Sequence, residues 1–294
     1  MFDIIIGNPP YIYYKNENKG GKEVYIKFTS DSINIARRVL FIMPDSFLKM
    51  ARNKNDSRKL IDYINRIKSM RKSVYPNVMT SIVEFDRSCV GSKNIEVNSL
   101  QLSKDAIISA GYVNDVDISR LLMSNVYCTC CRRVHSFYKI AYCGASQKTR
   151  ALGSNPFGFK TNHQSRYENL DIKQGKDNVL VMYAIDKYYS APLEHVIRNK
   201  NIVNKYKVLC KYTISENSNK IDYHIISPSV VCTESFLVVD YADSIDEAKE
   251  IKSYLENDLI QRLVLSTMVN RHLTRNNFTY VPLYRYRSIL DSLI

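Results

Sequence analysis

The feature that most constrains the fold is the opening stretch MFDIIIGNPPYIYY, in which a short apolar run leads directly into Asn-Pro-Pro-Tyr. Residues 2–6 are rich in isoleucine and are followed by Gly7, which is the pattern of a buried β-strand. Asn8 and Pro9 each precede a proline, so both are restricted to extended backbone. The rings of Pro9 and Pro10 also remove two backbone donors. The sequence therefore predicts a strand that ends in a stiff loop.

This loop, the NPPY lip (Asn8–Tyr11), is rich in hydrogen-bond acceptors. The Asn8 side chain and the backbone carbonyls supply the acceptors, and Tyr11 adds an aromatic face beside them. An ordinary surface turn would need neither the preceding isoleucines nor the tyrosine. A flat group that donates hydrogen bonds, such as an extruded nucleobase with an exocyclic amine, fits such a lip.

The positive charge indicates a polyanionic partner. The net charge is +13 over 294 residues, and much of it lies in two stretches. Residues 51–72 carry eight Lys or Arg against two Asp, and residues 132–176 carry nine against two acidic residues. Two such stretches favour a polyanionic partner, and nucleic acid is the leading candidate. No apolar run approaches the roughly 18 residues of a membrane span and no signal pattern opens the chain, so we expect a soluble, cytoplasmic protein without a membrane partner.

Seven cysteines, an odd number, argue against a secreted disulfide framework. Four of them, Cys128, Cys130, Cys131 and Cys143, lie close together with His135 between them. A zinc knuckle is one reading, but C-x-C-C lacks the usual spacing of two to four residues between ligands. Reduced and partly buried thiols are the favoured reading, and no metal is predicted.

The order of apolar patterns predicts an α/β fold with a partly parallel sheet in the first part of the chain. We expect strands at 2–6, 39–43 and 81–85, helices at 24–40 and 60–70, and a polar loop at 16–22. From about residue 126 the pattern changes to strands at 179–185, 204–212 and 236–241 and a helix at 244–269. We therefore place a domain boundary between residues 1–125 and 126–294.

The same residues resemble a known family. FDIIIGNPPY, VYIKFTSDSINIARRVLFIMPDSFL and VYPNVMTSIVEFDRS look like the catalytic half of amino-methylating DNA methyltransferases, most closely the adenine-specific enzymes of restriction–modification systems. SNPFGFKTN, VLCKY, CTESFLVVDYADSIDEAKEIKSYL and TYVPL resemble the target-recognition region of the large type II restriction–methylation proteins. The resemblance covers nearly the whole chain. It implies a partial Rossmann-like methyltransferase sheet followed by an α+β target-recognition domain.

The resemblance also implies roles for individual residues. Asn8, through its side-chain oxygen, and Pro9, through its carbonyl, accept hydrogen bonds from the adenine amine, and Pro10 completes the motif. Tyr11 stacks on the flipped base. Tyr75, in VYPNV, matches an aromatic residue that closes the other face, although phenylalanine is commoner there and a core tyrosine is the alternative.

The resemblance implies double-stranded DNA as the partner, and the candidate DNA contacts lie in the basic stretch that follows SNPFGF. They are Lys160, Asn162, His163 and Arg166. For Lys160 and His163, the alternative is that they are solvated loop residues.

The family's methyl donor is S-adenosylmethionine, which is held by a glycine-rich loop after the first strand. Only seven residues precede the NPPY lip, and no glycine occurs after Gly175. The remaining candidate is Gly144, in IAYCGASQ, which reads as a strand followed by a glycine.

Three explanations of the missing donor half stay open. A second polypeptide supplies it, the chain is a truncated or decayed enzyme kept as a catalytically silent DNA-binding protein, or the chain is a fragment of a longer parent. In each case the flank of the strand at 2–6 is expected to be apolar and unpaired.

Overall fold

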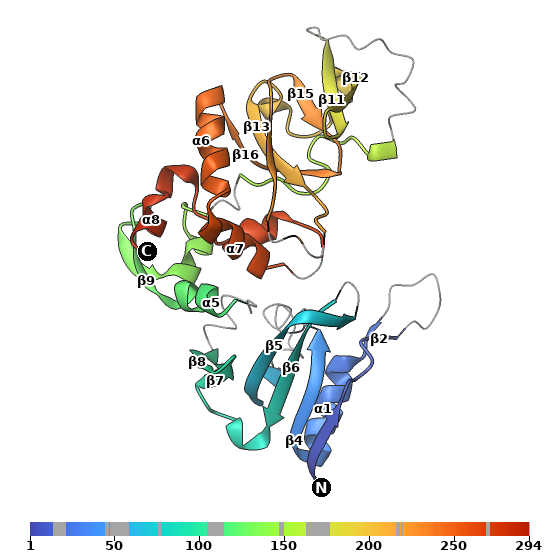
Figure 1. Ribbon diagram of the computed structural model, residues 1–294, viewed down its shortest axis with the longest axis vertical. Helices are drawn as coiled ribbons and strands as arrows, with labels where there is room; N and C mark the ends of the chain where they lie inside the picture. Colours follow the sequence, from blue (N-terminus) through green and yellow to red (C-terminus); the bar gives the residue numbers. More distant parts are fainter. Residues whose placement is uncertain are drawn as a thin grey trace. The chain divides into compact units, whose positions relative to one another are not determined.

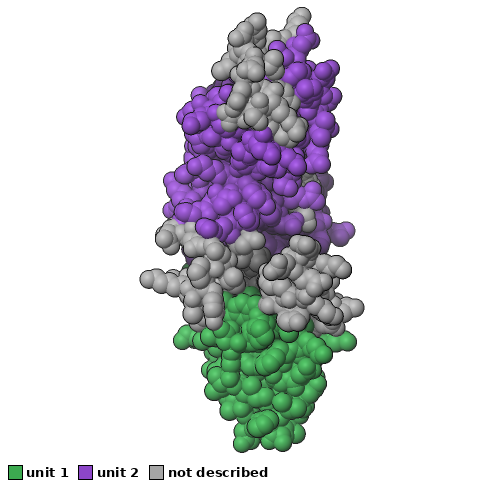
Figure 2. Space-filling view, turned by 90° about the vertical axis from the view of Figure 1, so that its right-hand side faces the viewer, with its two compact units in different colours: residues 1–123 green, residues 124–294 purple. Residues whose placement is uncertain are grey.

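The computed structural model describes residues 1–13, 22–44, 47, 59–75, 78–104, 115–146, 150–162, 177–215, 218, 220–268 and 271–293. The chain divides into two compact units, residues 1–123 and residues 124–294 (Figures 1 and 2). The predicted fold class is confirmed as mixed α/β, since helices accompany sheets that contain both parallel and antiparallel pairs. Among the described helices, none is long and apolar enough to cross a membrane.

The first unit is built on one six-stranded sheet with the order β1-β4-β6-β5-β7-β8 (Figure 1). The neighbours β1 and β4 are parallel, as are β5 and β7, while the other neighbours in this sheet are antiparallel. A short antiparallel pair of strands, β2 and β3, follows the NPPY lip. The strands are β1 (Phe2–Gly7), β2 (Ile12–Tyr13), β3 (Lys22–Glu23), β4 (Ala36–Pro44), β5 (Ile64–Tyr75), β6 (Val78–Asp86), β7 (Asn94–Val97) and β8 (Leu100–Ser103).

Helix α1 (Tyr25–Ile35) packs on β4, and its buried positions recur at helical spacing, with Tyr25, Thr29 and Ile33 on one face. The sequence predicted this helix as far as residue 40, which is wrong. From Ala36 onward the backbone is extended, and the buried side chains of β4 then alternate with more exposed ones. The helix α5 (Val116–Met123) ends the unit.

The predicted helix at 60–70 is also wrong in its larger part, because β5 begins at Ile64. The register of β5 against β6 shifts between Ile64 and Arg66, which marks a β-bulge or irregularity. An extra residue at this point places Ile64 and Ile67 on the same buried side of the strand. The bulge therefore gives a strand the i, i+3 apolar spacing that is typical of a helix.

The second unit contains a hairpin and two three-stranded sheets, ordered β12-β11-β15 and β14-β13-β16 (Figure 1). Apolar side chains from both three-stranded sheets belong to one buried cluster. The hairpin strands are β9 (Asn125–Cys128) and β10 (Arg133–Ser136). The sheet strands are β11 (Asn178–Ala184), β12 (Lys187–Pro192), β13 (Tyr206–Lys211), β14 (Tyr223–Ile226), β15 (Val230–Cys232) and β16 (Phe236–Ala242).

The helix predicted at 244–269 is two helices, α6 (Ile245–Leu255) and α7 (Asp258–Ser266). The side chain of Asn257 accepts a hydrogen bond from the Leu259 backbone at 2.9 Å and begins the second helix. Asn257 followed by Asp258 is an N-terminal signal that the sequence already contains. Helix α6 packs on β13, β14 and β16, and the short helix α8 (Ser288–Asp291) lies against β9.

Residues 137–142 form a 3-10 helix rather than a strand. Gly144 therefore does not follow a strand, and the reading of IAYCGASQ as a donor-binding loop is wrong.

Candidate functional site

The NPPY lip follows directly on the carboxyl end of β1. Asn8 is exposed and Pro9 is buried, so the buried ring anchors the loop whose neighbouring side chain reaches solvent. Pro10 is exposed and Tyr11 is half-buried. The order of burial therefore alternates along the lip, and Asn8 and Tyr11 are accessible to a ligand at the end of the strand.

Tyr11 is held from two sides. Its hydroxyl donates a hydrogen bond to the Ile42 carbonyl on β4, at 3.3 Å. Its ring meets the buried ring of Tyr25 edge to face, with centroids 6.2 Å apart and an interplanar angle of 81°. Tyr25 belongs to the core under the sheet, so the orientation of Tyr11 is set by the core of the first unit.

The strand that leads to the lip forms as predicted but is not buried. β1 pairs with β4 alone among the described strands, so it is an edge strand. Phe2, Ile4 and Ile6, which alternate along it, are 63%, 47% and 70% exposed, whereas Ile5 packs on the core. The apolar, unpaired flank that the sequence predicted is confirmed in the described part of the chain. A strand of this composition at an open edge is the kind of surface that another chain or segment covers.

The backbone of Tyr75 ends β5, where it pairs with Val78 at the start of β6. On its other side β6 pairs with β4, and Pro44 at the carboxyl end of β4 lies opposite Thr80, near the start of β6. The turn between β5 and β6 is therefore at the same edge of the sheet as the carboxyl end of β4. Because β1 runs parallel to β4, the NPPY lip is at this edge too. Three strand spacings, roughly 14 Å, separate β1 from β5, and the role of Tyr75 stays a prediction.

In the second unit, the segment SNPFGFKTN is anchored by two phenylalanines. Phe157 and Phe159 are buried in the shared core, while Lys160 and Asn162 beyond them are exposed. The Glu234 backbone donates to the Phe159 carbonyl at 3.0 Å, which fixes the segment beside the loop that precedes β16. The anchoring explains why aromatic residues precede the polar ones, a signal that the sequence reading did not use. His163 and Arg166 lie outside the described residues.

Gly158 lies between these anchors with φ +97°, a backbone conformation that favours glycine. A Cβ at this position would lie 2.3 Å from Cγ1 of Ile197. The glycine is therefore required for the segment to pass Ile197.

Not every cation of the basic stretch at 132–176 is available to a polyanion. Arg150 Nε lies 2.7 Å from Oδ1 of Asp240, and a guanidinium nitrogen also donates to the Tyr241 carbonyl. The guanidinium carbon is 4.4 Å from the centroid of the Tyr241 ring. Burial raises the pKa of Asp240 to about 6, and the Arg150 charge opposes that rise. Arg150 thus has a structural partner, whereas Arg132, Arg133 and Lys139 of the same stretch are exposed.

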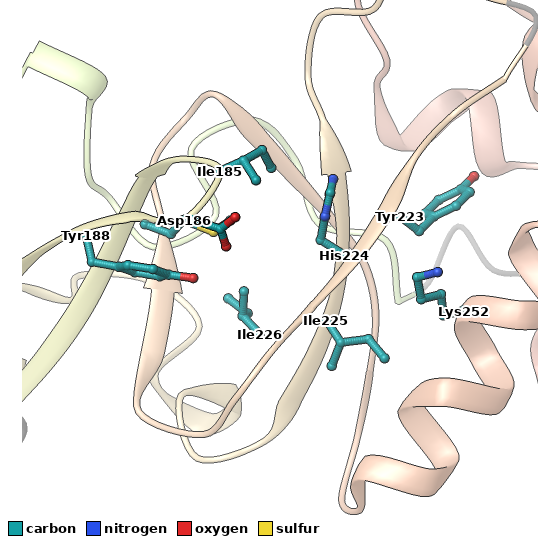
Figure 3. A pocket seen from close by; sticks show the side chains of 9 residues that line it. Ile185, Asp186, Tyr188, Tyr223, His224, Ile225, Ile226 and Lys252 are labelled. Carbon is teal, nitrogen blue, oxygen red and sulfur yellow. The ribbon is translucent and has the colours of Figure 1, made fainter.

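A hollow of about 260 Å³ opens in the second unit between the β11–β12 turn and β14 (Figure 3). Asp186, Tyr188 and His224 line it together with aliphatic side chains, and burial and the Asp186 charge raise the pKa of the Tyr188 hydroxyl. The nitrogen of Lys252, at its rim, lies 2.6 Å from a Glu256 oxygen. A lining with a carboxylate and a compensated lysine does not suit phosphate groups, and none of the predicted site residues belongs to it.

Comparisons with known proteins bear mainly on the first unit. Residues 1–76 match the family model of the Eco57I restriction-modification methylase. Among solved structures, the chain is similar to the Type IIL restriction-modification enzyme MmeI in complex with DNA, with 10% sequence identity and a TM-score of 0.47. The match covers 95% of this chain and 46% of the enzyme, so the chain spans less than half the length of that protein. No curated protein matches the chain.

Proposed function

We propose that this chain is part of a restriction–modification methyltransferase that transfers a methyl group to the exocyclic amine of a flipped adenine in duplex DNA. The observation that carries the proposal is the NPPY lip at the carboxyl end of a sheet strand, within residues that match the Eco57I methylase family. Asn8 is exposed there and Tyr11 is fixed by the core, as a site for a flat donor group requires.

The chemistry of the lip follows from its acceptors. An adenine amine is a weak nucleophile because its lone pair is delocalised into the ring. In the proposed complex the Asn8 side-chain oxygen and the Pro9 carbonyl accept the two amine hydrogens. This arrangement favours a pyramidal nitrogen whose lone pair points at the methyl group. Tyr11 stacks on the base and holds it in place, so positioning and fixed dipoles lower the barrier without a carboxylate base in the lip.

S-adenosylmethionine, the donor that the family implies, supplies an electrophilic methyl group when bound. Among the described strands β1 has a neighbour only on its β4 side, and Phe2, Ile4 and Ile6 along it are exposed. We propose that further strands, on a second polypeptide or on another segment of the same protein, cover β1 and complete the donor site.

We assign the second unit to target recognition. Lys160 and Asn162 are exposed at the end of a segment that two buried phenylalanines hold in place, which suits contacts to a DNA backbone or groove. Arg150 is left out of this role because Asp240 and Tyr241 engage it.

The experiment that tests the proposal is product identification. The chain is expressed in a host without adenine methylation, alone and together with the polypeptides encoded beside it, and total DNA nucleosides are analysed by mass spectrometry. We expect N6-methyladenine only when the donor-binding half is present, and its loss on Asn8→Ala. Methylated cytosine in its place would contradict the adenine assignment.

The rival reading is a catalytically silent DNA-binding protein. It predicts no methylated base in any of these combinations, together with salt-dependent binding of the purified chain to duplex DNA.

A further inference from the structure

We propose that the hairpin β9–β10 and the segment after it bind one zinc ion through Cys128, His135 and Cys143, with Cys130 or Cys131 as the fourth ligand. These residues lie outside the NPPY lip and outside the segment assigned to DNA recognition. The site would be structural, because four protein ligands leave no open position for a substrate.

The ligand atoms converge on the buried sulfur of Cys128. Its Sγ lies 3.0 Å from Sγ of Cys130 and 3.6 Å from Sγ of Cys143, and Sγ of Cys131 lies 3.5 Å from Nε2 of His135. The ligand atoms of Cys128, His135 and Cys143 all lie within 4.8 Å of one another, as do those of Cys128, Cys130 and Cys131. With Zn–S bonds of roughly 2.3 Å and Zn–N bonds of roughly 2.0 Å, the edges of a tetrahedron are about 3.5–3.8 Å. The separations of 3.6 Å and 3.5 Å are close to these edges, and the sulfurs of Cys128 and Cys130, 3.0 Å apart, would have to move apart when the ion binds.

The ring of His135 is oriented for coordination. Its Nδ1 lies 3.1 Å from the Ser136 carbonyl, so Nδ1 carries the proton that this carbonyl accepts. The other ring nitrogen, Nε2, then presents its lone pair toward the sulfurs. A backbone carbonyl that fixes the tautomer in this way is the usual companion of a metal-bound histidine.

The spacing that argued against a metal in the sequence is explained by the fold. Cys128 ends β9, Cys130 and Cys131 lie in the turn, and Arg132 in that turn has φ 54°, which bends the chain back into β10. Cys143 arrives from a separate segment, at the end of the 3-10 helix. The ligands therefore come from three parts of the chain, and the usual pair of cysteines two residues apart is not needed.

The ion would join the hairpin to the end of the chain. Three residues after Cys143, the Ser146 hydroxyl donates to the Thr279 carbonyl at 2.8 Å, and the Leu283 backbone donates to the Ala145 carbonyl at 2.7 Å. Binding energy at such a site stabilises the folded state, because the unfolded chain does not hold the ligands together.

Soft sulfur ligands with an imidazole, in a four-coordinate arrangement, select zinc over hard cations. Two sulfurs 3.0 Å apart are also compatible with a disulfide under oxidising conditions, since the Cys128–Cys130 and Cys128–Cys143 pairs are both close. The experiment distinguishes these two outcomes.

The test is metal analysis of the full chain purified with a reductant and without a chelator. We expect one zinc per chain, and after replacement by Co²⁺ the visible absorption of a tetrahedral site together with a thiolate charge-transfer band. Cys128→Ser and Cys143→Ser should each lower the zinc content at least about tenfold, and chelation should lower the melting temperature. Cys89→Ser, which changes a cysteine of the first unit, is the matched control and should keep one zinc.

His135→Cys keeps the proposal testable where a serine variant fails to fold. It should retain one zinc and intensify the charge-transfer band of the cobalt form by adding a thiolate. Three results would each overturn the proposal. The reduced wild-type protein could contain no zinc, or mass spectrometry after alkylation could find a disulfide from Cys128. The third such result is zinc that persists in both Cys128→Ser and Cys143→Ser.

Discussion

At the scale of single residues, the backbone of Gly158 and the side chain of Lys207 each affect the stability of the second unit. Gly158 turns the SNPFGFKTN segment past Ile197, and Lys207 is fully buried in β13. The Lys207 nitrogen donates to the Val203 carbonyl at 2.7 Å and to the Ile202 carbonyl at 3.4 Å. For each residue we predict a change in the free energy of unfolding.

Gly158→Ala should destabilise the second unit by about 1–3 kcal/mol, because φ +97° strains a residue with a Cβ and that Cβ meets Ile197. Thermal unfolding of the variant measures the loss. Gly153→Ala is the control, since a Cβ there meets nothing within 4 Å. Adding Ile197→Ala should relieve the clash but leave the strain. Equal stability of both glycine variants would show that the backbone at 158 is not constrained as described.

Burial lowers the pKa of Lys207 to about 7 from the ordinary 10.5. Between these values the unfolded chain holds a proton that the folded chain has released. Stability therefore rises with pH across this window, by up to about 1.4 kcal/mol per pH unit. Below pH 7 both states are protonated and this dependence vanishes.

Urea unfolding at pH values from 7 to 9.5 should show this rise in the wild type and not in Lys207→Met. Lys211→Met, at the exposed end of the same strand, should follow the wild type. A parallel pH dependence in the wild type and Lys207→Met would contradict the burial of this charge.

At the scale of elements, the sequence predicted well those strands whose apolar pattern and position agree, such as β1, β11 and β16. The prediction failed where a local irregularity of the backbone changes the spacing of the apolar residues or ends a helix early. The bulge after Ile64 gave β5 the spacing of a helix, and the extended backbone from Ala36 shortened α1. The NPPY lip could be identified from the sequence because its residues are contiguous. Cys128, His135 and Cys143 were noticed in the sequence, but a metal was not predicted there, because the convergence of their ligand atoms depends on a hairpin and on a segment that returns to it.

The open flank of β1 predicts self-association. Ile6→Glu places a charge on this 70% exposed position and should shift the protein toward the monomer in light scattering, with little change in melting temperature. The same variant should lower methylation when the donor-binding half is supplied. Val90→Glu changes an exposed valine that is not part of β1 and should leave the association unchanged. Association unaltered by Ile6→Glu would place the contact elsewhere.

At the scale of the whole molecule, we propose that residues 1–123 hold the base at the NPPY lip and that residues 124–294 contact the DNA. Duplex DNA binding should weaken steeply with salt, because each neutralised phosphate releases counterions. Lys160→Ala should weaken binding and lower the magnitude of the salt slope by about 1. Lys200 is also exposed, and Lys200→Ala should change the DNA affinity and the salt slope less than Lys160→Ala does. Equal effects of the two variants would remove the special role of the SNPFGFKTN segment.

In the proposed function, Asn8 holds the reacting amine. The most direct test of this role is the single-turnover rate of methyl transfer to duplex DNA by Asn8→Ala, measured with the donor-binding half present and beside the DNA dissociation constant. Asn34→Ala, which changes an exposed asparagine of α1, is the control. We predict a loss of about 100-fold or more in rate for Asn8→Ala with DNA affinity within about twofold, since a contact made in the transition state is removed. A rate within a few fold of the wild type would contradict the assignment of the NPPY lip as the catalytic site.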